Sequence, residues 1–360
     1  MGTLNMKQVL ASFAGRRVFV TGHTGFKGSW LSLLLTRAGA DVMGYALVPE
    51  TTPNHFDLLG LSKCMHHVVG DVTDGSNLKK VMSDFQPEYV FHLAAQALVK
   101  RSYDDPAGTF ATNVMGSAYL LDAVRHVKSV RSLVYITSDK CYDNVEWIWG
   151  YRENDRLGGH DPYSASKAAA EVLFSAYVRS YFSSRPQLGA ASTRAGNVIG
   201  GGDWSHDRII PDCVRSIEAT QPIRLRNPSA TRPWQHVLEP LSGYLLLAAG
   251  LREEPERFAG SWNFGPNSSE VRTVLDVART IVDKLGRGTI DIGVPSPVHH
   301  EAQLLQLNCE KAQQLLGWKP RWGVDKTLET TACWYAAWLS GQDMLATTEA
   351  QIREYFPDLT

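Results

Sequence analysis

The sequence lacks the features of a secreted, disulfide-stabilised or membrane-spanning protein. Its five cysteines are odd in number and scattered, and no two form a C-x-x-C pair. This usage is typical of a reducing cytoplasm and argues against a disulfide framework and a structural zinc site, so we expect no metal. No run approaches about 18 apolar residues, which argues against a membrane-spanning helix. The first residues lack the apolar core of a signal peptide, and we expect none.

The chain also has little net charge. A formal charge of −1 gives no electrostatic reason to expect a nucleic acid or an anionic membrane as partner. Of the 360 residues, 44% are hydrophobic and 20% are charged, which is typical of a globular protein with a sizeable core. The length suits one large α/β domain with an appendage, or two domains.

The first half of the chain alternates apolar β-branched runs with stretches of helical spacing. Such alternation predicts a parallel sheet built from right-handed crossovers. The expected helices lie at 26–39, 77–85, 110–127 and 163–182. The expected strands, buried on both faces, lie at 16–21, 41–47, 66–70, 88–94 and 131–137, and a further strand follows in 189–200.

This rhythm breaks after about residue 196, where "GNVIGGGDWSHDRIIPD" is irregular and rich in glycine. We therefore expect one domain at 1–196 and a smaller, mostly C-terminal α/β domain at 197–360, with some exchange of chain between the two lobes. An apolar helix near the end carries Trp334 and Trp338 one turn apart, which favours core packing over a base-stacking surface.

A glycine-rich turn joins the first expected strand to the first long helix. In "VFVTGHTGFKGSW", Gly22, Gly25 and Gly28 form a G-x-x-G-x-x-G arrangement. Glycine is needed where the backbone turns sharply and approaches a pyrophosphate without an intervening Cβ. The N–H groups of the helix that starts near Phe26 then face the anion. Because this turn heads a repeated βα pattern, it indicates a dinucleotide site.

The second strand defines the cofactor less well. A carboxylate at its end would bind the adenosine ribose and indicate NAD, but the chain has Tyr45 and Ala46 there and no arginine suited to a 2′-phosphate. Asp71, in "GDVTD" at the end of the third strand, is placed to touch adenine. We expect NAD, on the evidence of the glycine turn.

Tyr163 and Lys167 stand four residues apart on an expected helix, so their side chains share one face. A phenol with an ordinary pKa near ~10 is a poor base at neutral pH. A nearby ammonium favours the phenolate, and we expect Lys167 to lower the pKa of Tyr163 so that it can take a hydroxyl proton during hydride transfer. Ser138, after the fifth strand, and Asn113, in the preceding helix, complete this pattern.

At this point the chain resembles a known family, the extended short-chain dehydrogenase/reductases, and within it the nucleotide-sugar epimerases and dehydratases. The resemblance runs from about Gly15 to about Trp338. The motifs that carry it are "TGHTGFKGSWL", "GDVTD", "HLAAQ", "TNVMGS", "TSDKCYD", "YSASKAAAE" and "RAGNVIGGGDW".

The resemblance implies a fold and a set of site residues. The fold is a Rossmann-type, doubly wound parallel sheet that binds NAD, with a smaller domain that binds a nucleoside-diphosphate sugar. Ser138, Tyr163 and Lys167 take the positions of the catalytic Ser/Thr–Tyr–Lys triad. The implied cofactor contacts are Gly22, Thr24, Gly25, Phe26, Lys27, Gly28, Asp71, Val72, Leu93, Ala94, Ala95, Asn113, Tyr163 and Lys167.

The pair that follows the triad serine separates dehydratases from epimerases. In the family's epimerases it is small or neutral, whereas in its 4,6-dehydratases it carries an acid and a base, because elimination follows oxidation at C4. Asp139 fits the acid that protonates the leaving C6 hydroxyl. Lys140 stands where dTDP-glucose dehydratases carry glutamate, as the base for the C5 proton. A lysine base must be partly neutral, and we expect burial and the Lys167 cation to favour that form.

The lysine in "TSDKCYD" and the insertion "NVEWIWGYRENDRLGGHDPYSASK" look most like the subfamily of dehydratases that act on CDP-glucose and open the route to 3,6-dideoxyhexoses of O-antigen lipopolysaccharide. Gln303 and Leu304 stand where dTDP-glucose dehydratases place an arginine pair, so the nucleotide pocket must differ. For the substrate we expect Asn197, Arg208 and Arg232, since arginine forks match phosphate oxygens.

Alternatives stay open on the sequence alone. Another dTDP- or GDP-sugar 4,6-dehydratase, or a C4 epimerase, would share most of these motifs. A nucleotide-sensing regulator without activity would typically have lost Tyr163 or Lys167, and a catalytic Cys141 is less expected than a small buried filler. Family members usually pair through a four-helix interface, so we expect a cytoplasmic homodimer or homotetramer.

Overall fold

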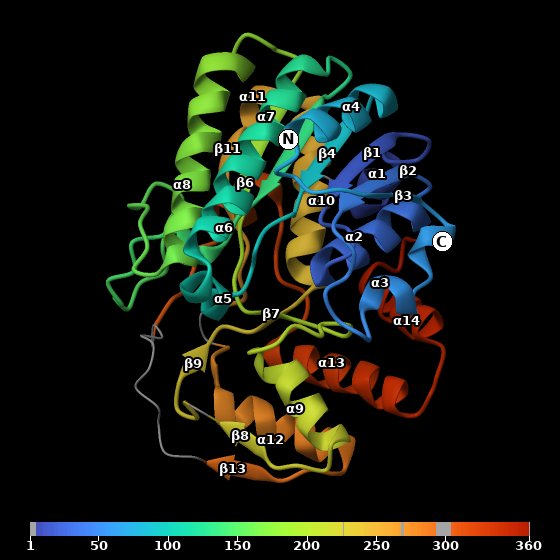
Figure 1. Ribbon diagram of the computed structural model, residues 1–360, viewed down its shortest axis with the longest axis vertical. Helices are drawn as coiled ribbons and strands as arrows, with labels where there is room; N and C mark the ends of the chain where they lie inside the picture. Colours follow the sequence, from blue (N-terminus) through green and yellow to red (C-terminus); the bar gives the residue numbers. More distant parts are fainter. Residues whose placement is uncertain (1–4, 226, 268–269, 293–303, 360) are drawn as a thin grey trace.

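The computed structural model describes residues 5–225, 227–267, 270–292 and 304–359, and its centre is a seven-stranded parallel sheet (Figure 1). The strand order is β11-β6-β5-β4-β1-β2-β3, which reverses direction of travel between β1 and β4. This is the doubly wound Rossmann-type arrangement, as predicted. The strands are β1 (Arg17–Thr21), β2 (Asp41–Ala46), β3 (His66–Val69), β4 (Tyr89–His92), β5 (Ser132–Ile136), β6 (Gly189–Arg194) and β11 (Gly260–Asn263).

Helices cover both faces of the sheet, each over its own apolar core. Because both faces are covered, β4 and β5 at the centre of the sheet are buried at every residue. One face carries α1 (Met6–Ala11), α2 (Phe26–Arg37) and α10 (Leu238–Glu253). The other carries α4 (Gly75–Phe85), α7 (Ser117–His126) and α8 (Pro162–Tyr177).

The third strand departs from its prediction. We expected it to be buried on both faces, but β3 is exposed at both ends, and the side chain of Val69 is 54% exposed. The cause is its position, since β3 pairs only with β2 and forms the edge of the sheet. The sequence shows an apolar run there but not its place in the strand order.

Beyond residue 196 the chain returns to the sheet before it builds the smaller lobe. The strand β11 and the buried helix α10 both belong to the Rossmann unit. The boundary at residue 196 and the exchange of chain between the two lobes stay predictions. The smaller lobe, seen below the sheet in Figure 1, contains α9 (Ile209–Glu218), β8 (Ile223–Leu225), α12 (Val274–Leu285) and β13 (Ile290–Ile292).

The helix α13 (Val324–Leu339) packs against α12 and carries the predicted tryptophan pair. Trp334 is fully buried and Trp338 packs against the same core, so the core-packing interpretation is confirmed. The other elements are α3 (His55–Leu58), η1 (Leu61–Lys63), α5 (Val99–Asp104), α6 (Pro106–Phe110), η2 (Ala111–Gly116), η3 (Asp139–Cys141), η4 (Val178–Phe182), β7 (Val198–Ile199), β9 (Thr231–Arg232), β10 (Gln235–His236), α11 (Pro255–Phe258), β12 (Arg272–Thr273), η5 (Ala312–Leu316) and α14 (Met344–Tyr355).

Two long predicted helices contain π-helical turns. The stretch 110–127 consists of η2 followed by α7, and 163–182 consists of α8 followed by η4. A π turn shifts the side chains that follow it relative to an ideal α-helix. Within the part of the chain that the structure describes, none of the helices combines the length and apolar character needed to cross a membrane.

Candidate active site

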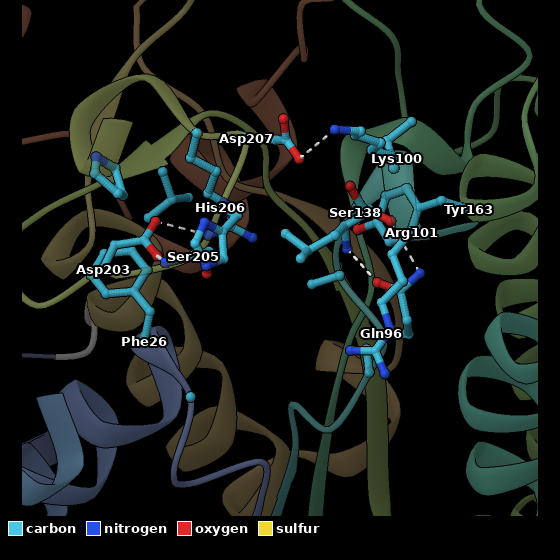
Figure 2. A pocket seen from close by; sticks show the side chains of 18 of the residues that line it. Phe26, Gln96, Lys100, Arg101, Ser138, Tyr163, Asp203, Ser205, His206 and Asp207 are labelled. Carbon is cyan, nitrogen blue, oxygen red and sulfur yellow. Dashed lines mark hydrogen bonds and ion pairs between the residues drawn. The ribbon is translucent and has the colours of Figure 1, made fainter. Parts of the chain in front are cut away.

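A large cleft opens at the carboxyl ends of the sheet strands, between the Rossmann unit and the smaller lobe (Figure 2). Its volume is about 1810 Å³, which exceeds the ~300–1,000 Å³ of a typical single-ligand pocket. One end is lined by the glycine turn and the other by residues of the smaller lobe, including Arg232. The cleft is therefore large enough for two ligands.

The glycine turn forms a cradle that admits no side chain at two of its three positions. Gly22 has a φ of +73°, and a Cβ there would lie 2.7 Å from the backbone nitrogen of Ala94. A Cβ on Gly28 would lie 2.0 Å from the carbonyl oxygen of Gly22. Gly25 has more room and caps the N-terminus of α2. The turn thus brings bare backbone and a helix N-terminus to the cleft, as a pyrophosphate site requires.

Most of the sequence-predicted cofactor residues line this cleft together. The exception is Asn113, which is buried away from it and holds neighbouring segments. Its side chain bonds both backbone groups of Gln96, at 2.8 and 3.0 Å, and donates to Ser166 Oγ at 2.8 Å. The residues that line the cleft are Gly22, Thr24, Gly25, Phe26, Lys27, Gly28, Asp71, Val72, Leu93, Ala94, Ala95, Tyr163 and Lys167.

The end of the second strand is occupied by an aromatic ring in place of a carboxylate. The buried Tyr45 donates a 3.0 Å hydrogen bond to the carbonyl of Asp71 and accepts one from Asn77 at 3.2 Å. Its ring fills the space beside Gly70, where a Cβ would lie 2.3 Å from it. The phenol therefore connects two strand ends, and Ala46 lines the cleft beside it.

The helix α8 presents Tyr163 and Lys167 to the cleft, both buried. Asp161 caps the helix by accepting from the backbone N–H of Ser164 at 2.9 Å, and Pro162 starts it. Figure 2 shows Tyr163 beside Ser138. Ser138 follows the end of β5 and lines the same cleft. The structure thus brings the predicted triad to one place.

The titration of this pair differs from expectation. Burial raises the pKa of Tyr163 to about 12, although the Ser138 side chain opposes the shift. The expected lowering of that pKa by Lys167 was therefore wrong for the protein by itself, because desolvation of the phenolate outweighs the Ser138 hydrogen bond and the attraction of the Arg208 cation. Burial also lowers the pKa of Lys167 to about 8, and the cation of Lys27 contributes to that shift.

Asp139 and Lys140 both line the cleft, immediately after Ser138. The Asp139 carboxylate is buried, accepts a 2.9 Å hydrogen bond from Ser138 Oγ, and packs against Gly196, where a Cβ would lie 1.8 Å from it. Lys140 is only partly buried. Among the described residues its ammonium makes no hydrogen bond or ion pair, so it is free to approach a ligand.

The buried cation that acts on Lys167 is Lys27 and not Lys140, which the sequence predicts to lie near Lys167. Lys27 lies between Gly25 and Gly28 of the glycine turn, among Arg208, Asp139 and Asp203. Burial lowers its pKa to about 8, the Arg208 cation adds to that shift, and the two carboxylates oppose it. The family resemblance implies a cofactor contact for Lys27 but no electrostatic role.

The expected substrate residues line the cleft from the other side. Arg208 is held by the buried carboxylate of Asp203, with an Nη1–Oδ2 distance of 2.9 Å. Arg232 lines the cleft from β9 and donates to the backbone carbonyl of Thr231. Asn197 has a φ of +51°, in the left-handed region that asparagine tolerates.

Sequence reasoning missed an ion pair across the cleft. Lys100, on α5, lies 3.6 Å from Asp207, in the loop before α9, and Figure 2 shows the two side chains meeting. The pair joins the Rossmann unit to the smaller lobe. Single charges in loops carry no pattern that predicts such a pairing.

Two further predictions can be placed. Cys141 is fully buried and is not among the residues that line the cleft, which confirms the interpretation as a core filler. Burial raises the pKa of its thiol well above the usual value. Gln303 lies outside the described residues, and the carbonyl of Leu304 accepts a 2.9 Å hydrogen bond from Asn144 in the insertion.

The fold and the Ser138–Tyr163–Lys167 arrangement define an extended short-chain dehydrogenase/reductase. Comparison with known proteins narrows the class. Residues 19–331 match the family model described as GDP-mannose 4,6 dehydratase, and the chain belongs to that family.

Individual relatives agree with this assignment. The chain is 49% identical to a CDP-glucose 4,6-dehydratase of Salmonella typhimurium over 96% of its own length and 98% of the relative's. Among solved structures, it is similar to a UDP-glucose 4-epimerase of Thermus thermophilus in complex with NAD, with 25% identity, a TM-score of 0.76, and coverage of 89% and 98% of the two chains. A dTDP-glucose 4,6-dehydratase of Bacillus anthracis in complex with NAD shares the fold, with 22% identity, a TM-score of 0.74, and coverage of 92% and 100%.

Proposed function

We propose that the chain is a CDP-glucose 4,6-dehydratase, which converts CDP-D-glucose to CDP-4-keto-6-deoxy-D-glucose and water. The observation that carries this proposal is the position of Asp139 and Lys140. Both line the cleft that contains Tyr163 and Lys167. A C4 epimerase has no use for an acid and a base at that position, whereas an elimination needs both. The 49% identity to a relative of that name supports the choice of substrate.

NAD is the cofactor that fits the residues present. The bare backbone at Gly22, the N-terminus of α2 and the neighbouring residues of the cleft suit a pyrophosphate and a dinucleotide. When bound, NAD accepts a hydride from C4 of the sugar and returns it at C6, so that the oxidised cofactor is restored in each turnover.

Tyr163 acts as the base for the C4 hydroxyl. Because burial raises the pKa of its phenol to about 12, the proton transfer needs a charge that favours the phenolate. Lys167 supplies it one helical turn away, and a bound positively charged nicotinamide ring would add to it. Ser138 orients the sugar hydroxyl and, in the protein itself, already opposes the upward shift of the Tyr163 pKa.

Asp139 and Lys140 then expel water from the 4-keto sugar. Oxidation at C4 acidifies the C5 proton, and Lys140 in its neutral amine form removes it. Asp139 in its protonated form donates its proton to the C6 hydroxyl, the C6–O bond breaks, and water leaves while a C5–C6 double bond forms. Hydride addition at C6 and return of a proton to C5 complete the reaction. The partial exposure of Lys140 allows its proton to exchange with solvent.

The nucleotide end of the substrate is assigned to the smaller lobe. Asn197, Arg208 and Arg232 all line the cleft, and the two guanidinium groups suit a diphosphate. Arg208 is held in place by Asp203. The product would serve the synthesis of 3,6-dideoxyhexoses for O-antigen lipopolysaccharide.

A homo-oligomer, a homodimer or homotetramer, fits the exposed apolar residues on the two helices proposed for pairing. These are Phe110, Met115, Tyr119 and Val172, all more than a third exposed, on 110–127 and α8. The five free cysteines support a location in the reducing cytoplasm. We also propose a domain division at residue 196, after which β11 and α10 return to the Rossmann domain.

The test is a comparison of substrates. Purified protein is incubated with NAD and, separately, with the CDP, dTDP, GDP and UDP forms of glucose, and with GDP-mannose. Mass spectrometry should show the loss of one water from CDP-glucose with the highest kcat/KM. Loss of water from another nucleotide sugar alone would reassign the base, and a product of unchanged mass would make the chain an epimerase.

A further inference from the structure

A buried ion pair lies directly behind the acid and base of the proposed reaction. Glu171 stands on α8 one turn beyond Lys167, and Arg194 ends the neighbouring strand β6. Arg194 Nε and Nη2 donate to the two carboxylate oxygens of Glu171 at 3.0 and 2.8 Å. Both side chains are only 2–3% exposed. The pair is a bidentate, fully desolvated salt bridge.

Each partner of this pair also holds one end of the segment 137–142. Glu171 accepts a hydrogen bond from Thr137 Oγ1, on the residue before Ser138. Arg194 Nη1 donates to Tyr142 Oη at 2.7 Å, and its guanidinium carbon lies 4.8 Å from the centre of the Tyr142 ring. The ends of the segment are thus joined through one ion pair, and the short helical turn η3 lies between them.

Glu171 and Arg194 are both charged at neutral pH. Burial alone would raise the pKa of Glu171, but Arg194 and hydrogen bonds from Thr137 and Ser192 hold it below its usual value. A buried salt bridge is a weak source of stability, because desolvation offsets most of the attraction. The salt bridge instead gives the neighbouring segment two attachment points in a fixed, bidentate geometry.

We propose that Glu171 and Arg194 are positioning residues of the dehydratase, which clamp the segment 137–142 so that Asp139 and Lys140 meet C5 and C6 of the sugar. The same helix α8 carries Tyr163, Lys167 and Glu171 on one face. The clamp therefore fixes the elimination pair relative to the residues that act at C4. This inference rests on the proposed function, whose failure can be distinguished below.

The clamp predicts separate fates for the two stages of the reaction. C4 oxidation depends on Tyr163 and Lys167, which lie on α8 outside the clamped segment, and also on the hydroxyl of Ser138, which lies within it. Elimination depends entirely on the pair between Thr137 and Tyr142, and a misplacement of about 1 Å can cost up to ~10²-fold in rate. Loosening the clamp should therefore slow elimination more than oxidation, so the reduced cofactor and the 4-keto sugar accumulate.

The experiment removes single hydroxyl groups and leaves the ion pair intact. Thr137→Val deletes the hydrogen bond to Glu171 and a second one to the carbonyl of Thr193. Tyr142→Phe deletes the hydrogen bond from Arg194 and a second one to Asn263. Ser192→Ala and Ser261→Ala are the matched controls. Each control removes a hydroxyl that bonds the same ion pair, at 2.8 Å to Glu171 and 3.1 Å to Arg194, from strands outside the clamped segment.

With CDP-glucose, Thr137→Val and Tyr142→Phe should lower kcat about 10- to 100-fold, with KM unchanged and reduced nicotinamide accumulating in a single turnover. The controls should stay within about twofold of the parent in kcat, although each of the four variants loses more than one hydrogen bond of its hydroxyl. Equal behaviour of variants and controls, or an equal loss of oxidation and elimination, would overturn the clamp.

A second readout is independent of turnover. Hydrogen exchange of the backbone amides of residues 138–142 should quicken in Thr137→Val and Tyr142→Phe but not in Ser192→Ala or Ser261→Ala. If the parent protein leaves CDP-glucose unchanged, the proposed function fails, while this exchange pattern still supports or refutes the clamp. Uniform exchange across all variants would refute it.

Discussion

The hydroxyl of Ser138 donates a 2.9 Å hydrogen bond to the carboxylate of Asp139. The residue that orients the C4 hydroxyl is therefore bonded to the residue proposed to protonate the C6 hydroxyl. The bond holds the buried Asp139 side chain at the cleft, where none of the described residues forms an ion pair with it. It also gives the two stages of the reaction a common element, so single substitutions are needed to separate them.

Replacing the acid should stop the reaction after C4 oxidation. In Asp139→Asn the side chain keeps its size but cannot supply a proton, so we expect kcat to fall about 10²- to 10⁴-fold. Absorbance of the reduced nicotinamide should rise on addition of CDP-glucose and persist. Asp143→Asn is the control, because Asp143 pairs with Arg156 at 3.3 Å, on a neighbouring loop. A variant that dehydrates at the parental rate would remove Asp139 from the mechanism.

Replacing the base should abolish exchange at C5. Lys140→Met keeps the length of the side chain and removes the amine, so we expect no incorporation of solvent deuterium at C5 while the C4 hydride still transfers. NMR spectroscopy of the recovered sugar measures both. Lys100→Met, which removes the exposed cation paired with Asp207, should leave exchange unchanged. Exchange at the parental rate in Lys140→Met would assign the base elsewhere.

Because of two buried lysine cations, the free energy of unfolding should change with pH in the alkaline range. Burial lowers the pKa of both Lys27 and Lys167 to about 8 from a usual 10.5. Between these two values the unfolded chain binds more protons than the folded one, so these groups make the protein more stable as the pH rises. Lys27→Met removes one of the two cations. Its melting temperature should exceed the parent's by a few degrees at neutral pH.

That difference should shrink as the pH rises through 8 toward 10.5, because the parent loses its buried charge over the same window. Thermal unfolding of the two proteins across this range measures it. A constant difference at all pH values would show that packing, and not charge, separates the two proteins.

Alanine substitutions at two glycines of the cradle should differ in their effect on stability. A Cβ on Gly28 would lie 2.0 Å from the carbonyl oxygen of Gly22, whereas one on Gly25 would lie 3.4 Å away. Gly28→Ala should therefore destabilise the fold by about 1–3 kcal/mol or more and weaken NAD binding. The free energy of unfolding of Gly25→Ala should stay within about 1 kcal/mol of the parent's. Denaturant titration compares the two, and equal stability would contradict the cradle geometry.

Much of the site could be predicted from the sequence because its residues follow strand ends. The glycine turn follows β1, Ser138 follows β5, and the carboxyl ends of parallel strands meet at one edge. Helical spacing placed Tyr163 beside Lys167. These local patterns were sufficient to bring the triad and the acid–base pair together before any coordinates were known.

What escaped prediction depends on contacts between distant segments. The strand β11 is short and lacks β-branched residues, and α10 is buried on all sides, so its apolar residues show no helical period. Glu171 and Arg194 lie in different elements, and neither shows its partner. The upward shift of the Tyr163 pKa follows from burial, which the Y-x-x-x-K spacing does not reveal.

The central claim is that oxidation at C4 is followed by expulsion of water through Asp139 and Lys140. The most direct measurement is a turnover of CDP-glucose with NAD in deuterated water, followed by mass spectrometry and NMR spectroscopy of the sugar. The account predicts a 4-keto-6-deoxy product that has lost one water and carries solvent deuterium at C5. A sugar that keeps its full oxygen content, or a dehydrated product with only protium at C5, would contradict it.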